Sequence, residues 1–278
     1  MESKELSIII TAYKKAELLE LCINSIKENI GSEIDYEIIV ADSETEESTS
    51  DLMREKFPKV IFLKNKKNQG FGRLVNQGID NSQGEYLFII NHDIIIKGSA
   101  IQKLLEFIKE NKTVGLVSPR LINFDGRIQP SAFKFYSWQT ILYRRTFLGK
   151  FAFSKRYLDK FLLKKEVSSG KIIDVDWVMG SAMMVSRKAV EVVGKFDKKF
   201  FMYFEDVDWC RRFWENNYRV VYNQTVTVAH YHGKASGNKG AVHAVLLNKY
   251  TRIHIKSAMV YFWKYLWKKN PHKMNNGK

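Results

Sequence analysis

The chain has 278 residues, of which 45% are hydrophobic, and its formal net charge at pH 7 is +15. This length fits one large α/β domain, or one domain with an appended arm, and this composition can build a sizeable core. No apolar run reaches the ~18 residues that a membrane-spanning helix needs, residues 1–5 run directly into an expected strand rather than a signal peptide, and Cys22 and Cys210 lack metal or redox spacing, so we expect small buried thiols in a reducing compartment.

Apolar runs alternate with helically spaced segments along the first 120 residues. We expect strands at residues 6–10, 36–41, 59–63, 85–90 and 114–118, and helices at 16–30, shortly before Phe57, from Phe71 onward and at 99–110. Short β-branched runs are typical of strands buried in a parallel sheet, and alternation of strands with helices is typical of doubly wound folds. We therefore predict an α/β fold with a mostly parallel sheet flanked by helices.

The alternation breaks after Pro119. Residues 130–166 mix aromatic and basic side chains, and we expect an insertion of short helices there. Residues 176–185 return to strand character, 187–194 form an expected helix with a glycine cap, Glu205 opens a further helix, and 219–222 and 225–229 are expected strands. From about residue 241 we expect one long helix.

The stretch EYLFIINHD, from Glu85 to Asp93, contains an apolar run that ends in the polar triplet Asn91, His92 and Asp93. A carboxylate at the carboxyl end of a central strand points into the crevice where open α/β sheets bind ligands. An oxygen ligand there suits Mg²⁺ or Mn²⁺. An Asx turn that only ends the strand is the alternative, and the residues alone leave both open.

Further polar groups follow other expected elements. Asp42 ends the second strand, the pair Glu205 and Asp206 opens a helix, and His230 ends a later strand. Together with Asp93, these groups are expected to converge on the carboxyl edge of one sheet. Acids in a first helical turn also suit the helix dipole, so capping is the alternative for the acid pair.

The order of these motifs resembles the GT-A-fold glycosyltransferases of the large inverting family 2, in particular their bacterial rhamnosyltransferase-like branch. The resemblance runs from about Leu6 to Ser236 and is carried by SIIITAY, IIVADSETEEST, NQGFGRLVNQGI, GEYLFIINHD and HYHGKAS. Its most specific stretch extends from Asp176 to Arg212.

This resemblance implies a donor site and a metal cofactor, Mn²⁺ or Mg²⁺. The residues implied for binding the nucleotide sugar are Thr11, Ala12, Tyr13, Asp42, Asn68, Gly70, Phe71 and Asn91. Asp93 would bind the metal, and His230 would complete the metal site, with His232 two residues further on. Asn91 stands where the family often has a second acid, which leaves it an amide oxygen or a ribose contact, and His92 is expected to be a strand-end side chain rather than a ligand.

The resemblance also implies an acceptor side. Asp206 would be the general base that takes a proton from the acceptor hydroxyl in a single displacement, while Glu205 would orient the acceptor or cap the helix. Asp208 is expected on the structural face of that helix. Trp177 and Gly180 would shape the acceptor side of the cleft, the tryptophan as a platform for a sugar ring.

The excess positive charge lies in two segments. Residues 130–166 contribute +7 and residues 241–278 contribute +8, which together equal the +15 of the whole chain. Residues 249–269 have the composition of a basic, aromatic interfacial helix. We expect a glycosyltransferase domain at 1–240, with a nucleotide-binding half at about 1–120 and an acceptor half at about 121–240, followed by a basic amphipathic helix at 241–278. We also expect a cytoplasmic protein, peripheral at the inner face of the cell membrane; a helix packed on the domain or in a homodimer is the alternative.

The sequence thus predicts a metal-dependent inverting glycosyltransferase. It would move a sugar, with L-rhamnose as first candidate, from a dTDP- or UDP-sugar to a glycan or lipid-linked acceptor in bacterial cell-surface polysaccharide synthesis. One alternative is a sugar-1-phosphate nucleotidyltransferase, but the loop from Thr11 to Lys15 has no glycine to grip a triphosphate. The other is a membrane- or nucleic-acid-binding protein without catalysis; a cleft lined with acids would repel nucleic acid, so no nucleic-acid partner is expected.

Overall fold

The computed structural model describes residues 4–231 and 249–271. Within these ranges nine strands form one sheet, in the order β3-β2-β1-β4-β10-β6-β11-β5, with β8 paired to β11. The strands of this sheet are β1 (Leu6–Tyr13), β2 (Tyr36–Ser43), β3 (Ile61–Asn65), β4 (Tyr86–Asn91), β5 (Ile94–Ile95), β6 (Val114–Ile122), β8 (Ile172–Asp174), β10 (Ala182–Ser186) and β11 (Arg219–His230). A separate pair is formed by β7 (Ala132–Phe133) and β9 (Trp177–Val178).

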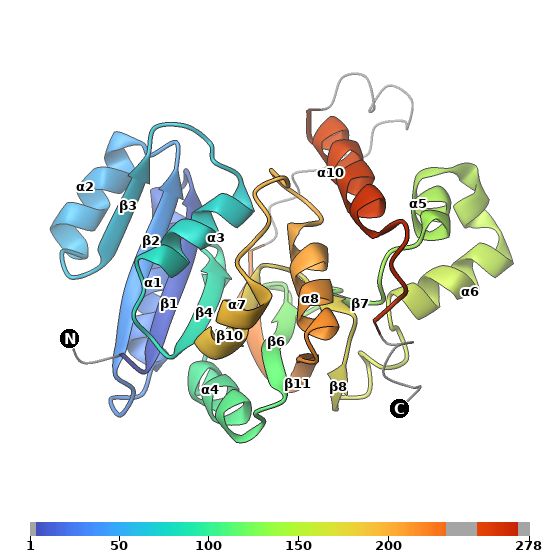
Figure 1. Ribbon diagram of the computed structural model, residues 1–278. Coiled ribbons are helices and arrows are strands. Elements are labelled where there is room, and N and C mark those ends of the chain that lie inside the picture. Colours follow the sequence, from blue (N-terminus) through green and yellow to red (C-terminus); the bar gives the residue numbers. More distant parts are fainter. Residues whose placement is uncertain (1–3, 232–248, 272–278) are drawn as a thin grey trace.

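The helices are α1 (Ala16–Asn29), α2 (Glu47–Lys56), α3 (Phe71–Asp80), α4 (Ala100–Glu110), α5 (Trp138–Arg145), the 3₁₀ helix η1 (Phe147–Lys150), α6 (Ala152–Phe161), α7 (Arg187–Val193), α8 (Glu205–Glu215) and α10 (Lys249–Tyr265). In Figure 1, α1, α3, α4, α7 and α8 lie against the strands of the sheet, whereas α5, α6 and α10 lie together beyond one end of it. The predicted α/β architecture is confirmed. No helix of the described part of the chain is long and apolar enough to cross a membrane.

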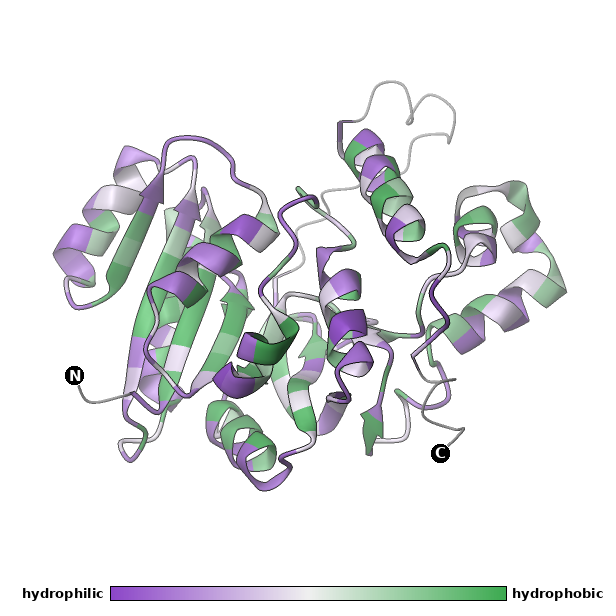
Figure 2. Cartoon of the chain, in the orientation of Figure 1, coloured by the Kyte–Doolittle hydropathy of each residue, from purple (hydrophilic) through white to green (hydrophobic). Residues whose placement is uncertain are grey.

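The sheet is mostly parallel. Strands β1 to β4 pair in parallel, and so do β6 and β11, whereas β10 runs antiparallel between β4 and β6. Successive residues of a strand face opposite sides of a sheet. In β1, accordingly, Ile9 packs in one core cluster with residues of α3 and α8, while Ile8 and Ile10 pack in a second cluster with residues of α1 and α4. Figure 2 shows the resulting hydrophobic sheet between helices of mixed character.

Three predicted strands differ from the structure. The strand expected at 176–185 is interrupted between β9 and β10 by Met179, Gly180 and Ser181. The two short strands expected at 219–222 and 225–229 are one strand, β11, whose register shifts between Asn223 and Thr227. The Asn223 side chain accepts hydrogen bonds from the backbone N–H and the hydroxyl of Thr225, which holds this irregularity.

The expected insertion of short helices at 130–166 is present as α5, η1 and α6. The expected C-terminal helix is present as α10 but ends at Tyr265, so residues 266–271 of that prediction are not helical; residues 241–248 and 272–278 lie outside the described residues. The division into a nucleotide-binding and an acceptor half stays a prediction.

Strand register brings the polar strand ends together. Thr11 of β1 is paired with Asn91 of β4, while the neighbouring Ala12 is paired with Asp42 of β2. Since these three strands are parallel, their carboxyl ends meet at one edge of the sheet, which is where ligands bind in open α/β folds.

Candidate active site

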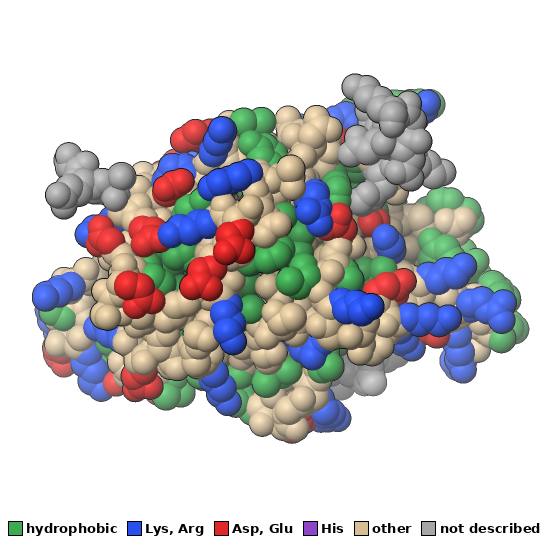
Figure 3. All heavy atoms as spheres, turned by 90° about the horizontal axis from the view of Figure 1, so that it is seen from below, with side chains coloured by type: hydrophobic (Ala, Val, Ile, Leu, Met, Phe, Trp, Pro, Cys, Tyr) green, Lys and Arg blue, Asp and Glu red, His purple; other side chains and the backbone are tan. Residues whose placement is uncertain are grey.

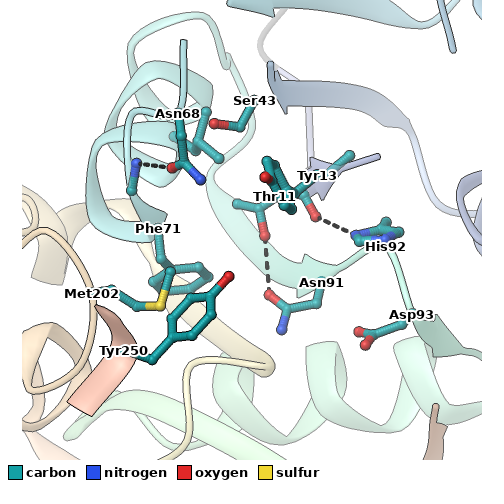
Figure 4. A pocket seen from close by; sticks show the side chains of 13 residues that line it. Thr11, Tyr13, Ser43, Asn68, Phe71, Asn91, His92, Asp93, Met202 and Tyr250 are labelled. Carbon is teal, nitrogen blue, oxygen red and sulfur yellow. Dashed lines mark hydrogen bonds between the residues drawn. The ribbon is translucent and has the colours of Figure 1, made fainter. Parts of the chain in front are cut away.

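A cleft opens at this edge of the sheet (Figure 4). The residues that line it are Thr11, Ala12, Tyr13, Ser43, Asn68, Gly70, Phe71, Leu74, Asn91, His92, Asp93, Met202 and Tyr250. The cleft therefore brings together eight of the residues that the sequence predicted, the nucleotide-binding set except Asp42, plus Asp93. Met202 and Tyr250 were missed: Met202 lies within the resembling stretch from Asp176 to Arg212 but carries no polar group, and Tyr250 lies in a segment that was expected to contact a membrane.

Asn91 and His92 are both engaged by β1. The Thr11 hydroxyl donates a hydrogen bond to Asn91 Oδ1 at 3.0 Å, and His92 Nδ1 lies 3.3 Å from the Thr11 carbonyl oxygen (Figure 4). The amide oxygen of Asn91, expected as a metal or ribose contact, is thus already bonded within the protein. Burial lowers the pKa of His92, so its ring is neutral near pH 7.

Asp42 lies beside the cleft rather than in its lining. Only 1% of the residue is exposed, and neither carboxylate oxygen accepts a hydrogen bond from the described residues. Burial raises the pKa of this carboxyl group to about 6. A buried carboxylate without donors is costly to a folded protein, so Asp42 is a candidate for a group that a ligand satisfies.

The loop before α3 approaches the opposite wall closely. Gly70 has φ +79°, and a Cβ at this position would lie 2.0 Å from the carbonyl oxygen of Phe201. The Asn68 side chain accepts the backbone N–H of Gly70 at 2.9 Å. This turn requires glycine both for its backbone angle and for the contact, and it directs Phe71 into the cleft wall.

Asp93 and His230 face each other at the end of β11. Asp93 Oδ1 lies 3.3 Å from His230 Nε2, while His230 Nδ1 lies 2.8 Å from Gln129 Oε1. Since the Gln129 oxygen can only accept, Nδ1 carries a proton, and Nε2 is the ring nitrogen that faces the carboxylate. Gln129, which the sequence analysis missed, therefore fixes the tautomer in the manner of groups behind metal ligands.

The pair fits a divalent cation in chemistry and in spacing. Two ligands at about 2.1 Å from an octahedral ion and at right angles stand about 3 Å apart. Across residues 4–231 and 249–271, however, no three His, Cys, Asp or Glu side chains are grouped as a metal site. Among the described residues, Asp93 and His230 are therefore the two groups at this place that could ligate a cation, and His232 lies outside the described residues.

Glu205 and Asp206 are the first two residues of α8, and they differ in burial and in hydrogen bonding. Tyr203 and Phe204, just before them, both adopt the left-handed conformation, with φ of 69° and 66°. Such strain persists where the surrounding structure holds it and is frequent at functional sites. Glu205 is 5% exposed and its Oε2 has no hydrogen-bond partner among the described residues, whereas Asp206 is partly exposed.

Asp206 is the better stabilised anion of the pair. Its carboxylate accepts backbone N–H groups from Gly180 at 3.2 Å and from Val207 at 2.9 Å. Burial raises the pKa of both carboxyl groups, and repulsion from Asp206 raises the pKa of Glu205 further. Because burial and the charge of Asp206 both disfavour an ionised Glu205, Asp206 ionises first and Glu205 retains its proton.

Gly180 lies between the cleft and Asp206. A Cβ at Gly180 would lie 2.8 Å from a ring carbon of Phe71 and 3.7 Å from Cβ of Asp206. Gly180 alone therefore separates the Asp206 side chain from Phe71, which lines the cleft.

Trp177 does not present an open ring. It is 6% exposed, stacks on Phe133 with ring centroids 4.4 Å apart, and donates its indole N–H to the Lys134 carbonyl. The expectation of a sugar platform is thus wrong in this structure, because an aromatic stack with Phe133 and Tyr136 occupies the indole. Trp177 is instead part of the hydrophobic core, together with Phe133 and Phe204.

Comparisons with known proteins agree with this arrangement. The family model for glycosyl transferase family 2 matches residues 7–168, more than half of the chain. The N-acetylglucosaminyl-diphospho-decaprenol L-rhamnosyltransferase of Mycobacterium tuberculosis is 25% identical over 273 residues, which cover 93% of this chain and 86% of that protein.

Two solved structures share the fold. A mannosyltransferase from Pyrobaculum calidifontis, in complex with GDP-Man and Mn²⁺, has a TM-score of 0.58 at 16% identity and covers 98% of this chain and 78% of its own. GalNAc-T7 with UDP, GalNAc and Mn²⁺ has a TM-score of 0.61 at 12% identity and covers 83% of this chain, which spans 44% of that one. With the sheet, the cleft and the family match in agreement, the chain belongs to glycosyl transferase family 2, and it is a glycosyltransferase with a GT-A-type α/β fold.

Proposed function

We propose that this glycosyltransferase is a metal-dependent, inverting enzyme that moves a sugar from a nucleoside diphosphate to an acceptor hydroxyl. The observation that carries the proposal is the shared edge of the sheet: the Asp93–His230 pair and the cleft lie there, and Asp206 stands across Gly180 from Phe71. An acid to hold a cation and a second acid to accept a proton are the two groups that this reaction needs.

On the donor side, Asp42 would accept hydrogen bonds from the base or the ribose of the nucleotide. Its unpartnered carboxylate supports this role, because N–H and O–H donors of a ligand would relieve the cost of its burial. Thr11, Tyr13, Asn68 and Phe71 would form the walls around the nucleotide. The bases in the two structural neighbours differ, which leaves dTDP, UDP and GDP as candidates for the test.

Asp93 and His230 would hold Mn²⁺ or Mg²⁺. When bound, the cation would neutralise the diphosphate leaving group. The support is the facing pair of ligand atoms, the tautomer fixed by Gln129, and the Mn²⁺ named in both structural neighbours. The diphosphate and water would supply the remaining ligands, as is usual for these ions.

Asp206 would act as the general base. The acceptor oxygen forms a bond to the anomeric carbon while the bond from that carbon to the diphosphate oxygen breaks, and the hydroxyl proton passes to Asp206. Attack opposite the leaving group inverts the anomeric configuration. Glu205, which retains its proton at neutral pH, would donate a hydrogen bond to the acceptor rather than accept the proton.

The mycobacterial relative suggests which sugar and which acceptor this enzyme uses. L-rhamnose and a lipid-linked saccharide are the first candidates, because the mycobacterial relative is named for them and spans most of the chain. Cell-surface glycan synthesis is the corresponding setting, shared by a poly(ribitol-phosphate) glucosyltransferase of Bacillus spizizenii, 29% identical over 46% of this chain.

A membrane surface would bring the enzyme to such an acceptor. Trp263 of α10 and Trp267, just after the end of this helix, are 83% and 92% exposed, and Phe147 in the insertion is 70% exposed. On the face drawn in Figure 3, acidic and basic side chains intermingle over the nucleotide-binding half, whereas lysine and arginine outnumber acids at the end that carries α6. Exposed aromatic residues with basic neighbours suit the interface of an anionic membrane, and they support the proposal that the enzyme acts at the inner face of the cell membrane.

The test is donor hydrolysis and transfer over a panel of nucleotide sugars with and without Mn²⁺. We expect Asp93→Ala to lose metal-dependent donor binding, and Asp206→Asn to keep donor binding while kcat falls by about 10²-fold or more. Asp159→Asn, which changes an exposed acid of α6 paired with Lys164, is the matched control and should behave as wild type. Equal activity in all four proteins would refute both assignments.

A further inference from the structure

The cleft receives one wall from the C-terminal helix. Tyr250, the second residue of α10, lines the cavity together with Met202 from the loop before α8. Figure 4 shows the Tyr250 ring next to Phe71, with its hydroxyl directed into the cavity toward Thr11 and Asn91. A residue from the far end of the sequence thus faces the expected nucleotide site.

Met202 and Tyr250 are held as one unit. The Ser257 hydroxyl of α10 donates to the Met202 carbonyl at 2.8 Å, one step along the loop from the strained Tyr203 and Phe204. His254 packs against both of those rings, with centroid distances of 5.1 and 5.3 Å. The first turns of α10 therefore fix the loop that leads into Glu205 and Asp206.

The far end of α10 is pinned to α8. Asp208, which is fully buried, accepts a hydrogen bond from the Tyr265 hydroxyl at 2.8 Å and lies 2.7 Å from Lys264 Nζ. The Arg211 guanidinium stacks 3.9 Å from the centre of the Tyr265 ring and donates to the Lys268 and Lys269 carbonyls. With both ends fixed, α10 cannot be displaced from the cleft without breaking buried contacts, so Tyr250 has a defined position.

We propose that Tyr250 is a donor-binding residue: its side chain closes the nucleotide pocket and contacts the bound nucleoside diphosphate. This inference rests on the proposed function, and it adds a determinant of donor affinity that lies outside the residues 7–168 matched by the family model. An aromatic ring can cover a base or a ribose, and a phenol hydroxyl can donate to a phosphate oxygen.

The test measures binding of UDP, dTDP and GDP to the full chain in the presence of Mn²⁺ by calorimetry. We expect Tyr250→Ala to raise the dissociation constant of the preferred nucleotide by about tenfold or more, the effect of losing one aromatic contact. Tyr250→Phe assigns the contact: retained affinity means that the ring makes it, and reduced affinity means that the hydroxyl makes it. In both cases the donor KM of Tyr250→Ala should rise more than its kcat falls.

Trp263→Ala is the matched control, because this residue belongs to the same helix but is 83% exposed. Its nucleotide affinity should equal that of wild type, and circular dichroism should show unchanged helix content in all variants. If wild type binds a nucleotide and Tyr250→Ala binds it equally well, the inference is overturned while the proposed function stands. If wild type binds none of the three nucleotides, the proposed function falls, and this inference falls with it.

Discussion

Asp42 provides a sharp test of the donor site, because its replacement should stabilise the protein while weakening ligand binding. Its carboxyl group is buried with no donor from the described residues at hydrogen-bond distance, and burial outweighs the weak contacts with Thr45 and the Ser43 backbone, which raises its pKa from 3.8 to about 6. A difference of about 2 pKa units between the folded and unfolded chain corresponds to about 3 kcal/mol at ~1.4 kcal/mol per unit.

The sign follows from proton binding. Because the folded state holds the Asp42 proton more tightly, the wild type is relatively stable at low pH and loses stability as pH rises from about 4 through about 6. Asp42→Asn mimics the neutral form at every pH. The free energy of unfolding of the variant minus that of wild type should therefore be about 2 kcal/mol larger at pH 8 than at pH 4. This corresponds to about 4 °C in Tm.

The assay is thermal and urea unfolding of both proteins at pH 4 and pH 8, followed by nucleotide binding with Mn²⁺ at pH 8. Asp208→Asn is the control of opposite sign: this buried aspartate is paired with Arg212, Lys264 and Tyr265, so its replacement should cost about 3 kcal/mol. Asp42→Asn should bind nucleotide on the order of tenfold more weakly. A stability difference between Asp42→Asn and wild type that does not change with pH, or an unchanged nucleotide affinity, would refute the reasoning.

Two further variants test a contact in the wall of the cleft and the exposed aromatic residues near the C-terminus. Gly180→Ala should raise the donor KM by about tenfold or more, since its Cβ would crowd the Phe71 ring at 2.8 Å, and an unchanged KM would contradict this contact. Replacing Trp263 and Trp267 together by serine should reduce sedimentation with phosphatidylglycerol liposomes, whereas Val192→Ser, at another exposed apolar position, should not. Unchanged sedimentation would remove the membrane proposal, and a change in oligomeric state instead would indicate a homodimer through α10.

The sequence predicts the strand-end residues well, because their signal is local. A short apolar run followed by a polar residue marks the end of a buried strand, and parallel strands then bring Thr11, Asp42 and Asn91 to one edge. The signal fails where a contact joins distant segments. Gln129 behind His230 belongs to no sequence motif, and the burial of Trp177 depends on Phe133, 44 residues earlier in the chain.

Helical geometry places the acids of α8 on different sides of the helix, where they have different roles. Asp206 and Asp208 are two residues apart, which turns their side chains by about 200° around a helix with 3.6 residues per turn. Asp206 accordingly accepts N–H groups beside the cleft, while Asp208 is buried against α10. Asp208 contacts α10, and α10 carries Tyr250 to the nucleotide pocket. The first turn of α8 therefore holds the proposed base, Asp206, and also contacts the helix that carries the proposed donor-binding residue. The acceptor and donor sides would then share one support, so a substitution that loosens Asp208 should impair donor affinity as well as stability.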